Sequence, residues 1–173
     1  RNIPGDPKSI TGNRVNAIGE DRNGNVWIGT GKGIDRFDRS SGTFRHYRLA
    51  APHAWTDNAI SVISIVSAKN GTVWVGTEKG LFLLDTTAGT NIGYKAEANN
   101  SSSQKGVTSL AEDRQGRIWI GTEHGLNIFD ESNSTLMPYT FSSAIQHSLS
   151  SNYVSALHRD AEGTMWVGTW GGG

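Results

Sequence analysis

The chain alternates short apolar segments with polar segments that contain Gly and Asp, and the same order returns along its length. In one repeat the first apolar segment runs from Val15 to Glu20 and the second contains Trp27. A third runs from Ile34 to Phe37, and a shorter fourth contains Tyr47. Short segments with apolar residues at alternate positions, bounded by turn residues, predict β-strands. We therefore expect four strands in each repeat and no helix.

The tetrapeptide Trp-Ile/Val-Gly-Thr sets the register of the repeats. It begins at Trp27, Trp74, Trp119 and Trp166, with spacings of 47, 45 and 47 residues. Its glycines are Gly29, Gly76, Gly121 and Gly168. Because these Trp and Gly residues occur in every copy, we expect them to serve the blade core rather than a ligand. A repeat of about 45 residues with four antiparallel strands is typical of a β-propeller blade.

The sequence thus predicts an all-β fold made of propeller blades, each a sheet of four antiparallel strands. About three and a half blades are present, over residues 13–58, 59–104, 105–151 and, incompletely, 152–173. An open propeller leaves blade faces and strand edges uncovered. We therefore expect the chain to be a fragment of a larger propeller, of seven blades by the resemblance described below.

The first turn of each repeat has a characteristic carboxylate. Asp21, Asp113 and Asp160 each precede a glycine, and this pattern predicts turn formers rather than acid catalysts. The second repeat departs from it, because Ala68 replaces the Asp. Matching this repeat from Asn58 predicts a first strand shifted by two residues, which would keep the same faces buried.

Charge and composition limit the partners. The formal net charge is +0 and Lys and Arg form no basic stripe, so we expect no nucleic-acid partner. Cysteine is absent and the five histidines lack ligand spacing, so no metal site and no cofactor are expected. No nucleophile motif or P-loop occurs either, so we expect no catalytic residues in this region.

The frame Val-x-x-Ile-x-Glu-Asp-x-x-Gly-x-x-Trp-Ile-Gly-Thr-x-x-Gly-Ile/Leu, seen from Val15 to Ile34 and closely from Val107 to Leu126, resembles the two-component regulator propeller repeat. The resemblance implies seven-bladed propellers in the periplasmic sensor region of bacterial membrane receptors. Their output domain is a histidine kinase or a diguanylate cyclase, and many respond to glycans. The implied partners are an oligosaccharide or other small ligand, the rest of the same chain, and a second copy in a homodimer. Contact with the membrane would come only through a segment outside this chain.

Residues that differ between repeats are the candidates for ligand binding, because a single ligand needs an asymmetric surface. If each blade runs through strands A to D, the D–A and B–C connections emerge on one face, near the central channel. Candidates on these connections are Arg14, Lys32, His53, Trp55, Lys79, Lys105, His124, Tyr153 and Trp170. Aromatic rings and cations of this kind suit a sugar acid or a sulfated oligosaccharide.

Two other functions fit the same fold. One is a carbohydrate-active or lyase-type propeller enzyme, and the other is a structural module that spaces or dimerises neighbouring domains. The fold alone does not separate them from a sensor, because one architecture hosts many activities. Loss of polysaccharide turnover on changing one channel residue would favour the enzyme. A closed propeller that no ligand stabilises would favour the structural module.

Overall fold

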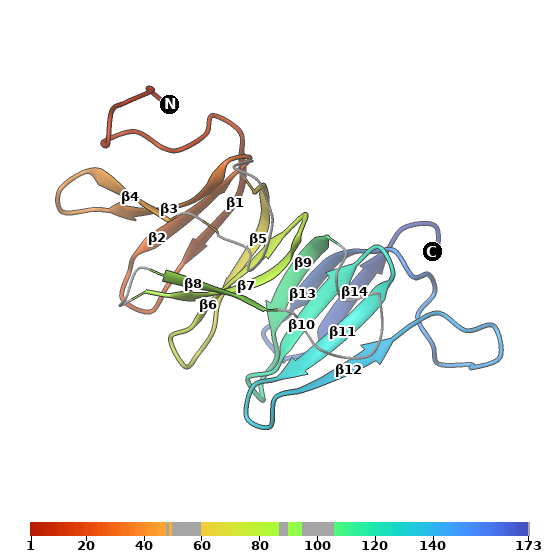
Figure 1. Cartoon of the computed structure of the whole chain (residues 1–173). Coiled ribbons are helices and arrows are strands. Elements are labelled where there is room, and N and C mark those ends of the chain that lie inside the picture. The colour runs from red at the N-terminus through yellow and green to blue at the C-terminus, as the bar shows by residue number, and fades with distance from the viewer. Residues whose placement is uncertain (48, 50–59, 87–89, 95–105, 173) are drawn as a thin grey trace. The chain divides into compact units, whose positions relative to one another are not determined.

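The computed structural model describes residues 1–47, 49, 60–86, 90–94 and 106–172. Within these residues the regular secondary structure is entirely β, as predicted (Figure 1). The first sheet contains β1 (Val15–Glu20), β2 (Val26–Thr30), β3 (Gly33–Asp38) and β4 (Thr43–Tyr47). The second contains β5 (Val62–Ser67), β6 (Val73–Thr77), β7 (Gly80–Asp85) and β8 (Thr90–Tyr94). The third contains β9 (Val107–Glu112), β10 (Ile118–Thr122), β11 (Gly125–Asp130) and β12 (Thr135–Tyr139), and the fourth contains β13 (Val154–Arg159) and β14 (Met165–Thr169).

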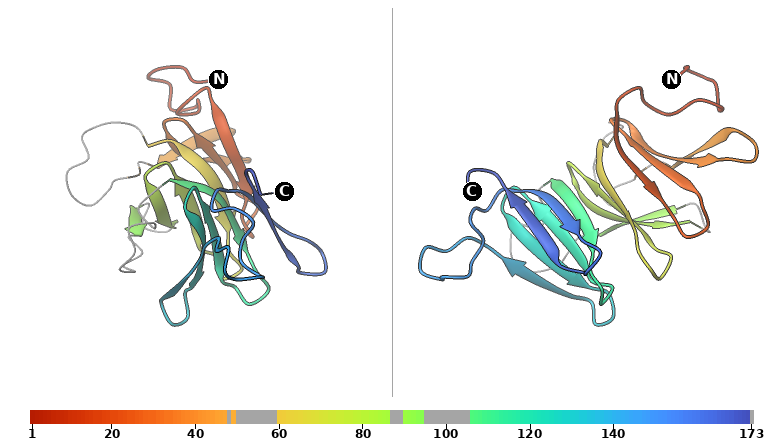
Figure 2. Two further views of the ribbon diagram at one scale, coloured as in Figure 1. Left: turned by 90° about the vertical axis from the view of Figure 1, so that its right-hand side faces the viewer. Right: turned by 180° about the vertical axis from the view of Figure 1, so that it is seen from behind.

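Each sheet is an antiparallel meander in which strands adjacent in sequence are adjacent in space. Views from the side and from behind show the strands of each blade forming a twisted sheet (Figure 2). The fourth strand lies at a sheet edge, where Pro138 of β12 fits because an edge strand can lack an N–H donor. The fold is a partial β-propeller. In the described part of the chain, no helix has the length and apolar character needed to cross a membrane.

The second blade corrects one expectation from the sequence. In β5 and β6, Val62 pairs with Thr77 and Ser64 with Gly76. The first blade has the same register relative to its Trp, with Val15 opposite Thr30. The predicted shift of two residues in the first strand is therefore wrong. The first strand keeps its pairing register with the Trp strand, because a slip would change which residues lie opposite each other.

The turn between the first two strands is organised by its carboxylate. Asp113 accepts hydrogen bonds from Trp119 Nε1 at 3.0 Å and from the backbone N of Arg117 at 2.9 Å. Burial of this carboxylate is the largest single influence on its pKa and opposes ionisation. The hydrogen bonds from Trp119 and Arg117 together outweigh burial, so the pKa of Asp113 lies below its ordinary value of 3.8. Asp21 and Asp160 bind Trp27 and Trp166 in the same way, which confirms their role as turn formers.

These carboxylates make stability depend on pH. Because the pKa values of Asp21, Asp113 and Asp160 are lowered in the folded chain, their ionised forms stabilise it above the ordinary value of 3.8. That stabilisation is lost as the pH falls through the lower, folded-state pKa values. We expect the urea midpoint to fall between about pH 5 and about pH 2. The Asp21→Asn variant should lose less over this range, and an equal loss would contradict the assignment.

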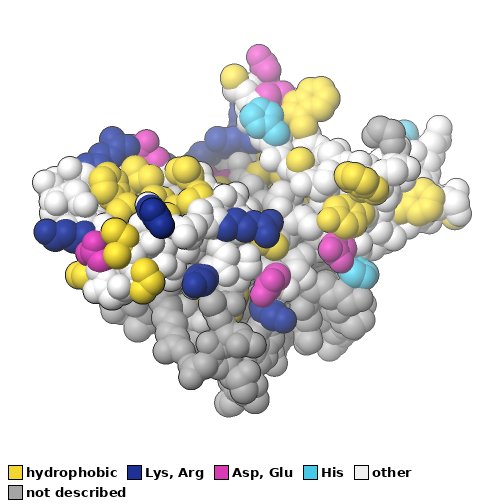
Figure 3. All heavy atoms as spheres, turned by 90° about the horizontal axis from the view of Figure 1, so that it is seen from above, with side chains coloured by type: hydrophobic (Ala, Val, Ile, Leu, Met, Phe, Trp, Pro, Cys, Tyr) yellow, Lys and Arg dark blue, Asp and Glu magenta, His cyan; other side chains and the backbone are white. Residues whose placement is uncertain are grey.

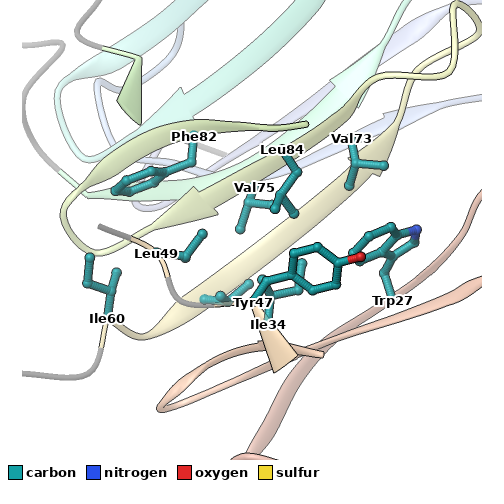
Figure 4. Packing of buried hydrophobic residues seen from close by; sticks show 10 residues of the cluster. Trp27, Ile34, Tyr47, Leu49, Ile60, Val73, Val75, Phe82 and Leu84 are labelled. Carbon is teal, nitrogen blue, oxygen red and sulfur yellow. The ribbon is translucent and has the colours of Figure 1, made fainter. Parts of the chain in front are cut away.

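The chain forms two compact units, residues 1–94 and 95–173. In the first unit β5 packs on β1 and β2, and a core forms between the two blades. Trp27 and Ile34 from the first blade meet Val75 and Leu84 from the second (Figure 4). The Trp27 and Tyr47 rings lie 5.2 Å apart between centroids, tilted by 53°. The Trp of one blade thus packs toward the blade that follows it.

The second unit repeats this arrangement. Trp119 packs with Leu126 and Ile128 of the third blade against Val154 and other residues of β13 and β14. Trp27 and Trp74 are fully buried, whereas Trp166 is 61% exposed. The exposed ring of Trp166 lies in the incomplete fourth blade, whose faces the sequence predicts to be uncovered.

Glycine in the tetrapeptide allows neighbouring blades to approach closely. A Cβ added at Gly29 would overlap Val62 Cγ1 and lie 3.0 Å from Val62 Cβ on the second blade. At Gly121 it would lie 2.5 Å from Ser109 Oγ of the same blade and 2.8 Å from Val154 Cγ1 on the fourth blade. At Gly168 the nearest atom would be Ala156 Cβ at 3.5 Å, which is ordinary contact. The interface between blades thus requires glycine at position 29, and at position 121 it does so together with Ser109 of the same blade.

Candidate ligand-binding site

The turn after the Trp strand has one frame in the first three blades. Thr30 Oγ1 donates to the carbonyl of Gly33 at 3.1 Å and accepts from the backbone N of Lys32 at 3.1 Å. The second and third blades repeat these bonds with Thr77, Lys79 and Gly80, and with Thr122, His124 and Gly125. Gly33 has φ of 140°, which disfavours any side chain. The frame therefore presents two variable residues between a fixed Thr and a fixed Gly.

The D–A connection ends beside this turn. The backbone N of Gly31 donates to Arg14 O at 3.0 Å, and that of Trp170 donates to Tyr153 O at 2.9 Å. In the second blade Glu78 N bonds Ser61 O at 3.3 Å. Within each of these blades, the two kinds of connection thus lie on the same face, as the strand order predicts. Figure 3 shows the atoms from above, with hydrophobic, cationic and anionic side chains among neutral ones.

The structure places six of the nine candidate residues. Arg14 and Lys32 lie around the turn of the first blade, and Tyr153 and Trp170 around that of the fourth. Lys79 and His124 occupy turn positions equivalent to Lys32 in the second and third blades. His53, Trp55 and Lys105 lie outside the described residues. Ligand contact by any of the nine remains a prediction.

Tyr153 and Trp170 form an exposed aromatic pair. Their ring centroids lie 6.5 Å apart with an interplanar angle of 57°. Tyr153 is 38% exposed and Trp170 is 76% exposed. The corresponding positions in the other repeats hold Arg14 with Gly31, Ser61 with Glu78, and Gly106 with Glu123. The pair is therefore specific to the fourth blade and is not required by the blade architecture.

A cavity of about 570 Å³ lies over the first blade, on the face that carries Lys32. Its walls include residues of the N-terminal segment, the turn at Gly33, and His46 and Tyr47 at the end of β4. The sequence prediction missed His46, because the residue lies within a strand rather than on a connection. A signal was available in the strand pairing, which sets His46 opposite Asp35.

Asp35 holds the His46 ring in place. The Asp35 side chain is completely buried, and its Oδ1 lies 2.8 Å from His46 Nδ1. Its Oδ2 accepts from the backbone N of Thr11 at 2.7 Å, and the Thr11 hydroxyl donates to Oδ1. A carboxylate that is bonded at both oxygens tolerates burial. These contacts also fasten the N-terminal segment to the first blade.

Comparison with known families confirms the repeat assignment. The family model described as two component regulator propeller matches residues 9–32, 101–124 and 148–171. Three stretches of the chain thus match two component regulator propeller repeats. Each matched stretch ends on the turn after a Trp strand, which is the turn that presents Lys32, His124 and Trp170. None of the three matched stretches includes Trp74 of the second blade, in which Ala68 replaces the Asp.

Several solved structures resemble this chain. One is an extracellular domain described as a hybrid two component system from B. thetaiotaomicron, with TM-score 0.79 and 27% identity over 92% of this chain. A second such domain from the same organism has TM-score 0.62 and 23% identity over 99% of it. Virginiamycin B lyase from Staphylococcus aureus has TM-score 0.66 and 17% identity over 89% of it.

The last two likenesses, at their low identities, show the fold alone. The chain spans 21%, 27% and 48% of the lengths of these three proteins, in the order given above. A search of curated proteins gave no match to the repeats.

Proposed function

We propose that this chain is part of the ligand-sensing propeller of an extracytoplasmic, two-component type receptor in a bacterial membrane. The repeats support this proposal, as does the likeness to an extracellular domain described as a hybrid two component system. In this proposal the region binds a ligand and performs no catalysis itself. Binding would alter the receptor through the difference in ligand affinity between its two signalling states.

The exposed Tyr153–Trp170 pair supports a glycan as the ligand of this sensor. Two tilted rings, 6.5 Å apart, offer apolar faces to the C–H surface of a sugar ring. Trp and Tyr contribute strongly to recognition because they have large, rigid surfaces and polar edges. Because neither ring is part of the buried core, contact with a sugar would not disturb the packing of the blade. We therefore assign the pair as a stacking platform for an oligosaccharide.

Replacing Trp170 with alanine tests this assignment. We expect wild-type protein to bind at least one member of a panel of neutral and uronate-containing oligosaccharides. The Trp170→Ala variant should bind it about tenfold or more weakly, because loss of one stacking ring removes about 1.5 kcal/mol. Saturation-transfer NMR and calorimetry would measure binding. The control is Tyr139→Ala, which removes an exposed aromatic residue of β12 outside the pair.

Other outcomes would favour other functions. Equal weakening in both variants would contradict a specific platform. Cleavage of a bound oligosaccharide, abolished by changing one residue of this face, would favour the enzyme. A coding sequence that encodes no membrane span and no output domain would contradict the receptor, even if the platform bound a sugar. A homodimer, also part of the proposal, would appear in light scattering of the full-length protein.

A further inference from the structure

The cavity over the first blade has the size and walls of a small-molecule site. Its volume of about 570 Å³ falls within the range of about 300–1,000 Å³ that is usual for ligand pockets. Leu49 and Ile60, each 7% exposed, contribute apolar wall. Polar groups come from Asp6 on the N-terminal segment, Lys32 on the turn and His46 on β4. An apolar cavity with a few polar groups is the usual form of a site that recognises a small organic molecule.

His46 is oriented as a hydrogen-bond acceptor. A carboxylate only accepts, so the contact of 2.8 Å from Asp35 Oδ1 assigns the proton of the ring to His46 Nδ1. In the neutral ring Nε2 then has a lone pair and accepts. Among the described residues Nε2 has no hydrogen-bond partner. Because Asp35 and Thr11 fix the ring, a ligand that donates to Nε2 meets an acceptor that is already in place.

The two charged groups of the cavity have opposite sign. Lys32 is exposed and forms no ion pair with any residue that the structure describes. Its ammonium suits a carboxylate, which gains a charge-assisted hydrogen bond. Asp6 accepts one hydrogen bond from the backbone N of Lys8 at 2.8 Å and retains acceptor capacity for a ligand hydroxyl or ammonium group.

Comparison between repeats separates this arrangement from the needs of the blade. The pair Asp35 and His46 is replaced by Phe82 and Gly93 in the second blade. In the third blade the corresponding pair is Asn127 and Pro138. Blades therefore fold without an Asp–His pair at these positions. The pair serves something particular to the first blade.

We propose that this cavity binds a small carboxylic acid with a hydrogen-bond donor on the adjacent carbon, that is, an α-amino or α-hydroxy acid. The carboxylate binds Lys32, the donor binds His46 Nε2, and an apolar side chain packs on Leu49 and Ile60. Asp6 favours the α-amino acid over the α-hydroxy acid. The proposal does not depend on the glycan platform in the other unit.

Four matched probes test the ligand class by calorimetry with the whole chain. They are L-leucine, 2-hydroxy-4-methylpentanoate, 4-methylpentanoate and 3-methylbutylamine. We expect leucine, the hydroxy acid or both to bind, and the last two probes to bind about tenfold or more weakly, because each lacks one anchoring group. No binding by leucine and the hydroxy acid would overturn the proposal. Equal binding of 4-methylpentanoate would also overturn it.

Three variants locate the site. We expect Lys32→Met and His46→Asn each to weaken binding about tenfold, because each removes one polar anchor. The Asn amide replaces the Nδ1–H donor to Asp35 but lacks Nε2, so the melting temperature should stay near that of wild type. Lys8→Met, which changes a lysine outside the cavity wall, should bind normally, as should Trp170→Ala. Equal weakening by Lys8→Met, or full binding by Lys32→Met, would overturn the proposal.

Discussion

Replacing Asp113 with alanine is expected to lower the free energy of unfolding of the second unit by about 3 kcal/mol. The carboxylate is 3% exposed and accepts from Trp119 Nε1, Arg117 Nε and the backbone N of Arg117 and Gln115. Alanine leaves these donors without their acceptor, and hydrogen bonds to a charged group are the stronger kind. Urea denaturation followed by Trp fluorescence would measure the loss.

The matched control for this variant is Asp38→Ala. Asp38 also organises a turn, through Ser40 and Ser41, but its hydrogen bonds are exposed to solvent. Water can satisfy the groups that Asp38 releases, so we expect a much smaller loss. Equal losses from the two variants would show that burial of the Trp119 contact does not matter.

Replacing Gly29 with alanine is expected to destabilise the first unit by about 2 kcal/mol. The added methyl would overlap Val62 of the second blade, whose Cβ would lie only 3.0 Å away. Packed interiors have little free space, so the two blades must separate or Val62 must leave its rotamer. Alanine also restricts the unfolded chain, which stabilises by about 0.5–1 kcal/mol, but the overlap is the larger effect.

Gly168→Ala is the matched control, because the residue has the same place in the tetrapeptide. Its methyl would meet Ala156 Cβ at 3.5 Å, so the overlap is absent. In this chain we expect no loss of stability and a small gain from the restricted unfolded state. Thermal unfolding of both variants would decide the matter. A similar loss at Gly168 would mean that the strand itself, and not the neighbouring blade, requires glycine.

The blade strands could be predicted from the sequence because their signals are local. Alternation around Trp27 and the Asp-to-Gly turn at Asp21 depend on neighbouring residues, and both repeat. The sequence predicts that the tetrapeptide glycines serve the blade core, but it does not show why these positions require glycine. Gly29 is required by Val62, which lies in the next repeat and meets it only when blades pack.

The candidate sites were predicted less completely. The strand order brings Tyr153 to Trp170, so a topology of four strands was enough to place them on one face. His46 is not predicted from the sequence, because it lies within a strand and the candidate residues lie on the connections between strands. Its importance depends on Asp35 and on the N-terminal segment that covers it, and these contacts form only in the folded chain.

The Thr-x-x-Gly turns have a consequence for how such proteins diversify. Their hydrogen bonds join the Thr side chain to backbone atoms, so this frame does not depend on which side chains occupy the two central positions. The residues at positions 31–32, 78–79 and 123–124 can therefore vary while the turn frame stays the same. A library randomised at these positions would vary the surface of each blade while the blade kept its turn frame. The residues displayed on such a turn can therefore be exchanged by substitution alone, without insertions.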